Sequence, residues 1–131
     1  RRFEESYDIM KRLAAADPSS ATLQRDVSVS LERLGEVLLA QGDLAGAGRR
    51  VEESHDILKR LAAADPSSAA LQRDVWASMW RLVRLPDGGV TWPLIVSAME
   101  DMQRRGVLAP ADVKYLEEAR RQAASGPRTG P

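Results

Sequence analysis

The central part of the chain carries apolar residues at the spacing of one helix face. They recur at intervals of three and four residues: Leu23, Val27, Leu31, Leu34 and Leu38. Because an α-helix turns once in about 3.6 residues, these side chains share one face. We predict a helix from Pro18 to Gln41, with Asp17 as its N-cap and Pro18 in its first turn.

A second helix is predicted from Leu44 to Ala64, after a turn at Gln41-Gly42-Asp43. Its buried stripe is expected at Ala47, Val51, Ser54, Leu58 and either Leu61 or Ala62. Asp65-Pro66 is expected to end this helix and cap the next. No segment alternates apolar and polar residues, so the sequence predicts an all-α protein without strands.

The chain repeats itself with a period of 48 residues. Residues 1–34 and 49–82 are identical at 26 of 34 positions. Such identity indicates a duplicated helix pair that buries its apolar face by stacking on its neighbours. We predict a repeat array over residues 1–85, with a partial unit at 1–16, a full unit at 17–64 and a partial unit at 65–85.

The repeat pattern ends after Leu82, where Val83 replaces the counterpart of Gly35 and Pro86 begins a helix-breaking segment. Residues 86–124 are predicted to form a C-terminal cap of two helices, 91–105 and 110–124. Their apolar stripes are expected at Leu94, Ile95, Ala98, Met99 and Met102, and at Val113, Leu116, Ala119 and Ala123. Residues 125–131, rich in Gly and Pro, are predicted to be a disordered tail.

Composition narrows the classes of function. Basic and acidic residues are equal at 19 each, which argues against nucleic acid and against a polybasic membrane anchor. The chain has no cysteine and one histidine, so we expect no metal site and no cofactor. No apolar run approaches the ~20 residues of a membrane span. We expect a cytoplasmic protein that does not insert in membranes, and we interpret the chain as part of a longer polypeptide.

One stretch resembles the tetratricopeptide repeat family. The matching residues are Leu31, Leu34, Gly35, Leu38, Gly42, Ala47, Val51 and Ser54, and Phe3 lies where the family has an aromatic residue. The resemblance covers roughly residues 1–85, but the period is 48 where the family has 34. One extra heptad per helix explains the difference and rotates the buried face by only ~20°. The long variant looks like arrays found in bacterial multidomain proteins.

The resemblance implies antiparallel helix pairs stacked in a right-handed superhelix, with the first helices lining a concave face that binds protein partners. On the first helices, the residues off the buried stripe are Arg25, Val29, Glu32, Glu36 and Leu39, followed by Arg73, Ala77, Trp80 and Arg84. With Trp76 added, these residues except Ala77 are the nine candidate partner-binding residues. Ala77 is an apolar neighbour on the same stripe. The alternative is that they are ordinary solvated positions.

The two tryptophans replace Ser28 and Glu32 of the first unit. Trp76 and Trp80 lie four residues apart on one helix face and are either an exposed anchor for a partner or core covered by the C-terminal helices. We favour the covered arrangement and also expect Trp92 in the core.

Polar repeats are expected to be structural. His55 aligns with Tyr7, which favours a packing or surface position over a catalytic one. The pairs Arg25-Asp26 and Arg73-Asp74 are interpreted as ion pairs between units or as caps, in preference to a site for a partner's charge. The sequence offers no nucleophile beside a base and no phosphate-binding glycine motif, so no enzymatic activity is predicted.

Two functions remain open. The first is a scaffold that binds a protein or peptide partner through its concave face. The second is a self-association module for attached effector domains, with contacts through the N-terminal edge helix 1–16. Its apolar residues Phe3, Ile9, Met10 and Leu13 are expected to be incompletely covered.

Overall fold

The computed structural model describes residues 2–86 and 88–126, without the side chain of Phe3. Its helices are α1 (Arg2–Ala16), α2 (Ala21–Ala40), α3 (Leu44–Ala64), α4 (Ala69–Val83), α5 (Trp92–Arg104) and α6 (Val113–Ser125), with a 3-10 turn, η1 (Pro110–Asp112). The described residues contain no strand, so the all-α prediction is confirmed. Of the predicted tail, Ser125 and Gly126 lie inside and just after α6, and residues 127–131 lie outside the described residues.

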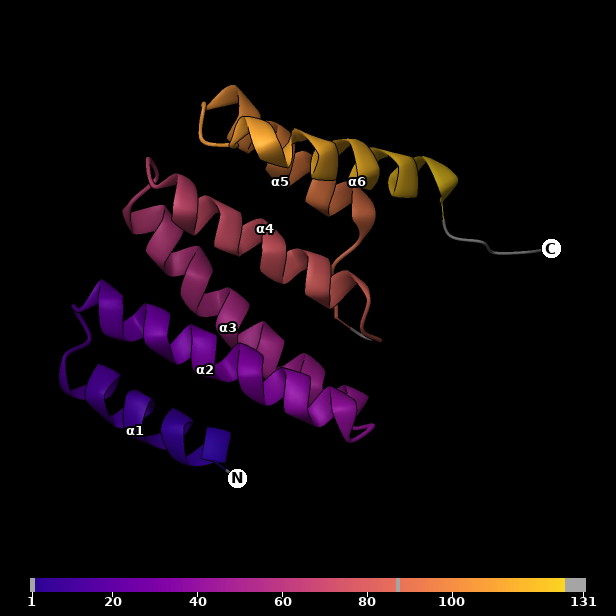
Figure 1. Cartoon of the computed structure of the whole chain (residues 1–131). Helices are drawn as coiled ribbons and strands as arrows, with labels where there is room; N and C mark the ends of the chain where they lie inside the picture. Colours follow the sequence, from indigo (N-terminus) through magenta and orange to yellow (C-terminus); the bar gives the residue numbers. More distant parts are fainter. Residues whose placement is uncertain (1, 87, 127–131) are drawn as a thin grey trace.

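Each helix packs against the helices before and after it in the sequence. Figure 1 shows α1, α2, α3 and α4 in a row, with α5 and α6 overlapping beyond α4, and successive helices run in opposite directions. Gly42 allows the tight turn between α2 and α3, because its φ of 83° lies in the left-handed region that glycine adopts easily. The short connections therefore make sequence neighbours into spatial neighbours.

The predicted N-caps at Asp17 and Asp65 were wrong by three residues. Ser20 caps α2, its side chain accepting a hydrogen bond from the Leu23 amide at 3.2 Å, and Ser68 does the same for Leu71 at 3.2 Å. A serine hydroxyl reaches the amide three residues on from extended backbone, and both serines have that backbone. The prolines therefore lie in the preceding turns instead of the first helical turn.

The 48-residue period is visible in the contacts. The Gln24 side-chain amide donates to the Ala14 carbonyl at 3.4 Å, and Gln72 donates to the Ala62 carbonyl at the same distance. The spacing continues beyond the identical residues, since the N-caps of α3 and α5, Asp43 and Thr91, are also 48 residues apart. Helix α5 thus begins at the position of a second helix, although its sequence has diverged.

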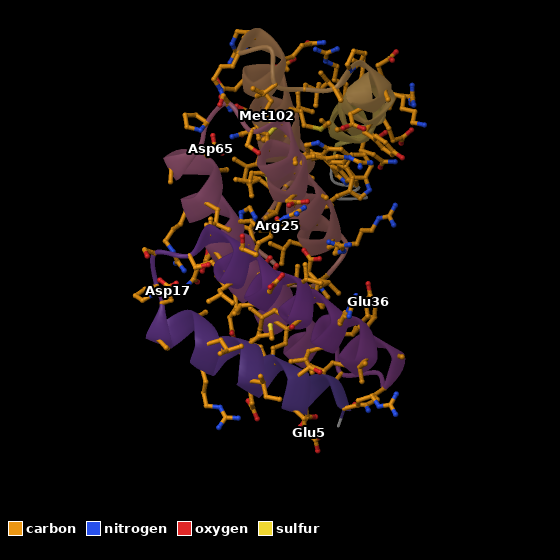
Figure 2. All side chains as sticks on the ribbon, turned by 60° about the vertical axis from the view of Figure 1, so that its left-hand side comes forward. Glu5, Asp17, Arg25, Glu36, Asp65 and Met102 are labelled. Carbon is orange, nitrogen blue, oxygen red and sulfur yellow. The ribbon has the colours of Figure 1, made fainter. Side chains whose placement is uncertain are left out.

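Two apolar clusters form the core. One lies between α1, α2 and α3 and includes Tyr7, Leu31, Leu34 and Ile57; the other spans α3 to α6. In Figure 2, the labelled acidic side chains Glu5, Asp17 and Asp65 lie along the outside of the helices. Each cluster is shared by successive helices, so no single pair has a core of its own.

Most of the predicted stripes are buried or half-buried, with one correction. Leu34, Gly35, Ala47 and Leu58 are buried, and of the two alternatives for the last position of the α3 stripe, Ala62 is buried and Leu61 is half-buried. Leu94 was predicted to face inward but is 51% exposed. The buried face of α5 is set by Ile95, Met99 and Met102, and Leu94 points about 100° away from Ile95 on the helix.

Candidate partner-binding surface

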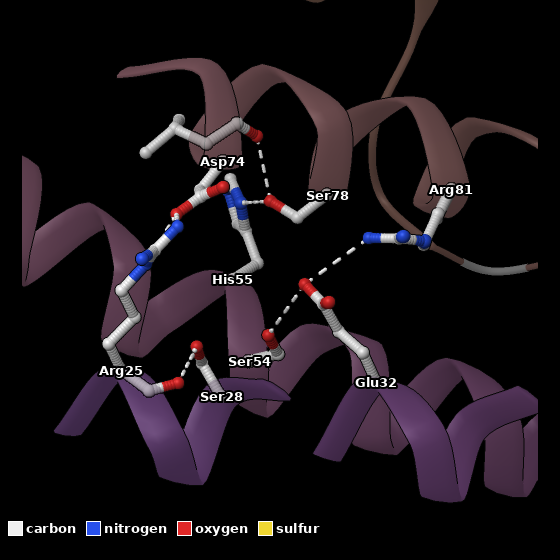
Figure 3. A network of polar contacts seen from close by, with 9 residues as sticks. Arg25, Ser28, Glu32, Ser54, His55, Asp74, Ser78 and Arg81 are labelled. Atoms are coloured by element: carbon white, nitrogen blue, oxygen red, sulfur yellow. Dashed lines mark hydrogen bonds and ion pairs between the residues drawn. The ribbon is translucent and has the colours of Figure 1, made fainter. Parts of the chain in front are cut away.

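Two predicted partner-binding residues on α2 form ion pairs with α4 (Figure 3). Arg25 lies 2.9 Å from the Asp74 carboxylate, from Nη2 to Oδ2. Glu32 lies 3.2 Å from Arg81 and accepts a hydrogen bond from the Ser54 hydroxyl at 3.3 Å. Both groups therefore link neighbouring first helices, and a partner could bind them only by competing with these contacts.

The arginine pairing recurs one repeat later. Arg73, the counterpart of Arg25, lies 3.3 Å from the Asp112 carboxylate, which is 6% exposed at the start of α6. The predicted ion pairs between units are thus confirmed for Arg25 with Asp74, and Arg73 makes the equivalent contact to the last helix. Of the two pairs, Arg25–Asp74 is largely exposed, and pairs of that kind contribute little to stability, roughly 0–1 kcal/mol.

His55 packs in the same network (Figure 3). The Ser78 hydroxyl donates to the Val75 carbonyl at 2.7 Å, so it accepts from His55 Nδ1 at 2.6 Å. Burial lowers the pKa of His55, and the neighbouring Lys59 lowers it further. His55 thus lies at a packing position, as predicted, and its burial favours the neutral imidazole.

Burial has the opposite effect on Glu32. The pKa of Glu32 is raised because the carboxylate is partly removed from water, and Arg81 and the Ser54 hydroxyl offset only part of that cost. A partly buried carboxylate held by two partners is typical of a structural ion pair.

Four aromatic rings meet where α4 contacts the C-terminal helices. Trp76 is 5% exposed, and its ring centroid lies 5.9 Å from Trp80 and 5.2 Å from Tyr115. Trp80 is half-buried and makes edge-to-face contacts with Trp92 at 4.9 Å and Tyr115 at 5.9 Å. The favoured prediction that the C-terminal helices cover the tryptophans is confirmed for Trp76 and holds in part for Trp80.

A hollow of about 400 Å³ opens beside these rings. We call it the aromatic hollow; it is lined by Arg73, Asp74, Trp76, Ala77, Trp80, Arg81 and Tyr115. Three of the nine candidates, Arg73, Trp76 and Trp80, thus line one concave site. Sequence reasoning missed Tyr115, because the α6 sequence does not match the repeat and so provided no register against α4.

The remaining candidates do not line this hollow. On α2, Val29 and Leu39 are 38% and 48% exposed, and Glu36 is also exposed. Arg84 is exposed at the end of α4. These four side chains are accessible to a partner, but no hollow gathers them with the aromatic rings.

A second hollow of about 400 Å³ lies where α1, α2 and α3 meet. It includes Tyr7, Gln24, Asp56 and Arg60. One repeat later the corresponding space is narrowed by Arg105, which donates to the Pro66 carbonyl at 3.4 Å and the Gln72 side-chain oxygen at 3.2 Å. The sequence does not predict either of these two hollows. Their size depends on the distance between successive second helices, α1 and α3 or α3 and α5, which the sequence does not specify.

Comparisons of the chain with protein-family models, with curated proteins and with solved structures found no match. Within the described part of the chain, none of the helices has the length and hydropathy needed to cross a membrane. The same residues contain no group of three or more side chains placed to bind a metal ion. Function must therefore be inferred from the chemistry of the surface itself.

Proposed function

We propose that the chain is a protein-interaction scaffold, a tetratricopeptide-like right-handed stack of helix pairs that binds a protein or peptide segment. The observation that carries the proposal is the aromatic hollow, where Trp76, Trp80 and Tyr115 lie beside Arg73 and Arg81. Trp, Tyr and Arg dominate the energetics of protein interfaces, because large flat side chains bury much area at a small cost in conformational entropy.

The chemistry of the hollow indicates the kind of segment it accepts. Trp80 is only half-buried, so a partner's apolar side chain can cover its remaining surface. The side chains of Arg73 and Arg81 are 61% and 44% exposed, which leaves donors for a carboxylate next to that apolar residue. We infer a peptide with an apolar anchor flanked by acidic residues.

A catalytic role is not part of the proposal. The acid in the hollow, Asp74, is paired with Arg25, and the lining residues include no serine, threonine or cysteine that a base could activate. The groups present suit binding through area and charge.

Selection from a displayed random-peptide library tests the proposal. Selected peptides should contain an apolar residue next to Asp or Glu, and their binding should change tryptophan fluorescence. Trp80→Ala should weaken binding by at least roughly tenfold, as expected for an interface hot spot, and Arg81→Gln should weaken the acidic peptides and reduce their salt dependence. Leu39→Ala, exposed outside the hollow, is the matched control. Equal binding by Trp80→Ala, with its fold verified by circular dichroism, would rule out the hollow as the binding site.

A further inference from the structure

Two helices of nearly the same sequence differ in how much of one face is covered. Ile9 on α1 corresponds to Ile57 on α3, yet Ile9 is 47% exposed and Ile57 only 9%. Leu13 is 46% exposed, whereas its counterpart Leu61 is half-buried. Since the residues are identical, the difference arises from what lies against each helix.

Helix α2 makes the difference. Ile57 and Leu61 pack in one cluster with the apolar stripe of α2, which includes Val27 and Leu31. The next turn of α3 is covered in the same way, since Ser54 is 0% exposed beneath Glu32. Helix α3 therefore packs between α2 and α4, whereas the main helix neighbour of α1 is α2, with further side-chain contacts from Tyr7 and Ala14 to α3.

We propose that the uncovered face of α1, formed by Ser6, Ile9 and Leu13, is a docking site for an amphipathic helix with the pattern of α2. The repeated sequence specifies this occupant, because the same face on α3 is already bound by such a helix. The docked helix carries an apolar stripe equivalent to Val27 and Leu31 against Ile9 and Leu13.

Charge complementarity gives a second, independent reason. Asp26 on α2 occupies the position of Asp74 on α4, and Asp74 pairs with Arg25 of the preceding first helix at 2.9 Å. A docked helix with arginine at the position of Arg25 would place a guanidinium beside Asp26 in the same geometry. A single docked helix in one register can therefore meet both needs: apolar residues equivalent to Val27 and Leu31 for the α1 face, and an arginine equivalent to Arg25 for Asp26.

The α2 helix of a second, folded copy of the chain cannot be this occupant. The stripe of α2 is already buried between α1 and α3, with Leu31 1% exposed and Leu34 4% exposed. A folded copy therefore cannot present the pattern, and the occupant is a separate helix of this type.

The experiment is a fusion in which residues 17–48 precede Arg1 of the full chain. Because Arg1 corresponds to Arg49, joining Gly48 to Arg1 reproduces the natural Gly48–Arg49 linkage. Amide hydrogen exchange should slow along α1 by at least roughly tenfold, since covering one isoleucine alone contributes enough free energy for that. Ile9→Arg should abolish this protection in the fusion and leave the global stability of the unmodified chain almost unchanged.

Leu94→Arg is the matched control, because Leu94 is 51% exposed on α5, far along the row of helices from α1. It should have the same small effect in the fusion and in the unmodified chain. Unchanged exchange along α1 in the fusion would overturn the proposal. Sedimentation of the unmodified chain across a concentration series measures its oligomeric state. A monomer at all concentrations supports a separate helix as the occupant. A dimer that Ile9→Arg dissociates would show that a second copy covers this face instead.

Discussion

The close approach of α2 and α3 at Gly35 gives the sharpest prediction. A Cβ atom added there would lie 3.2 Å from Val51 Cγ2 and 3.5 Å from the Ala47 carbonyl oxygen. Carbon atoms prefer a separation of about 3.5–4.0 Å, so even one methyl group requires the neighbour to move. Gly35→Leu adds three further carbons to the same space and should lower the free energy of unfolding by about 1–3 kcal/mol.

Gly48 is the matched control. It is also a buried glycine inside a helix, but a Cβ there would meet no atom within 4 Å. Gly48→Ala should therefore raise stability by about 0.5–1 kcal/mol, the usual gain from replacing a helical glycine. Gly35→Ala gains the same helix propensity, but the close contact between the new Cβ and Val51 offsets part of that gain. Gly35→Ala should therefore raise the free energy of unfolding by less than Gly48→Ala does.

Chemical denaturation of the four proteins measures these differences, with equal m-values verifying that the unfolding reaction is the same. The difference between the two alanine variants isolates the cost of packing from helix propensity. A change below ~0.5 kcal/mol for Gly35→Leu would refute the idea that this glycine sets the helix separation.

Three further predictions concern the ion pair, the histidine and the C-terminal core. A double-mutant cycle on Arg25 and Asp74 should give a coupling of about 0.2–1 kcal/mol that decreases in high salt, because both groups are substantially exposed; a larger coupling that persists in salt would contradict this. The pKa of His55 is lowered in the folded state, so the unfolded chain takes up the proton first as the pH falls; stability should be full above pH 6.5 and decline just below it, and His55→Gln should remove that decline in pH-dependent unfolding. Leu116→Ala should cost about 2–5 kcal/mol in denaturation because Leu116 is 0% exposed, whereas Leu94→Ala on the surface should cost less than ~0.5 kcal/mol; similar costs would place the C-terminal core elsewhere.

The sequence alone determined the helices and their buried faces through short-range physics. Leucines at intervals of three and four define a helix face whatever surrounds it, so Leu31, Leu34 and Leu58 could be predicted as core. The 48-residue repeat strengthened these predictions, because a helix predicted in one unit also had to be compatible with the nearly identical sequence of the other unit. The sequence did not decide which residue caps α2, because Asp17 and Ser20 are both common N-cap residues. Asp17 was predicted, and the structure has Ser20.

The tertiary structure decided which surface residues act together. The repeated Arg-Asp motifs indicated an ion pair between units, which Arg25 and Asp74 form, but no local pattern identifies the partner of Glu32, because Arg81 lies 49 residues further along the chain. Tyr115 joins the tryptophans only because α6 packs back onto α4. Exposure was also decided at this level: Ile9 and Ile57 are the same residue in the same helical pattern, but only Ile57 packs in the cluster that contains Val27 and Leu31 of α2. Periodicity specifies the face a helix buries, whereas the neighbour that covers that face is a property of the assembled stack.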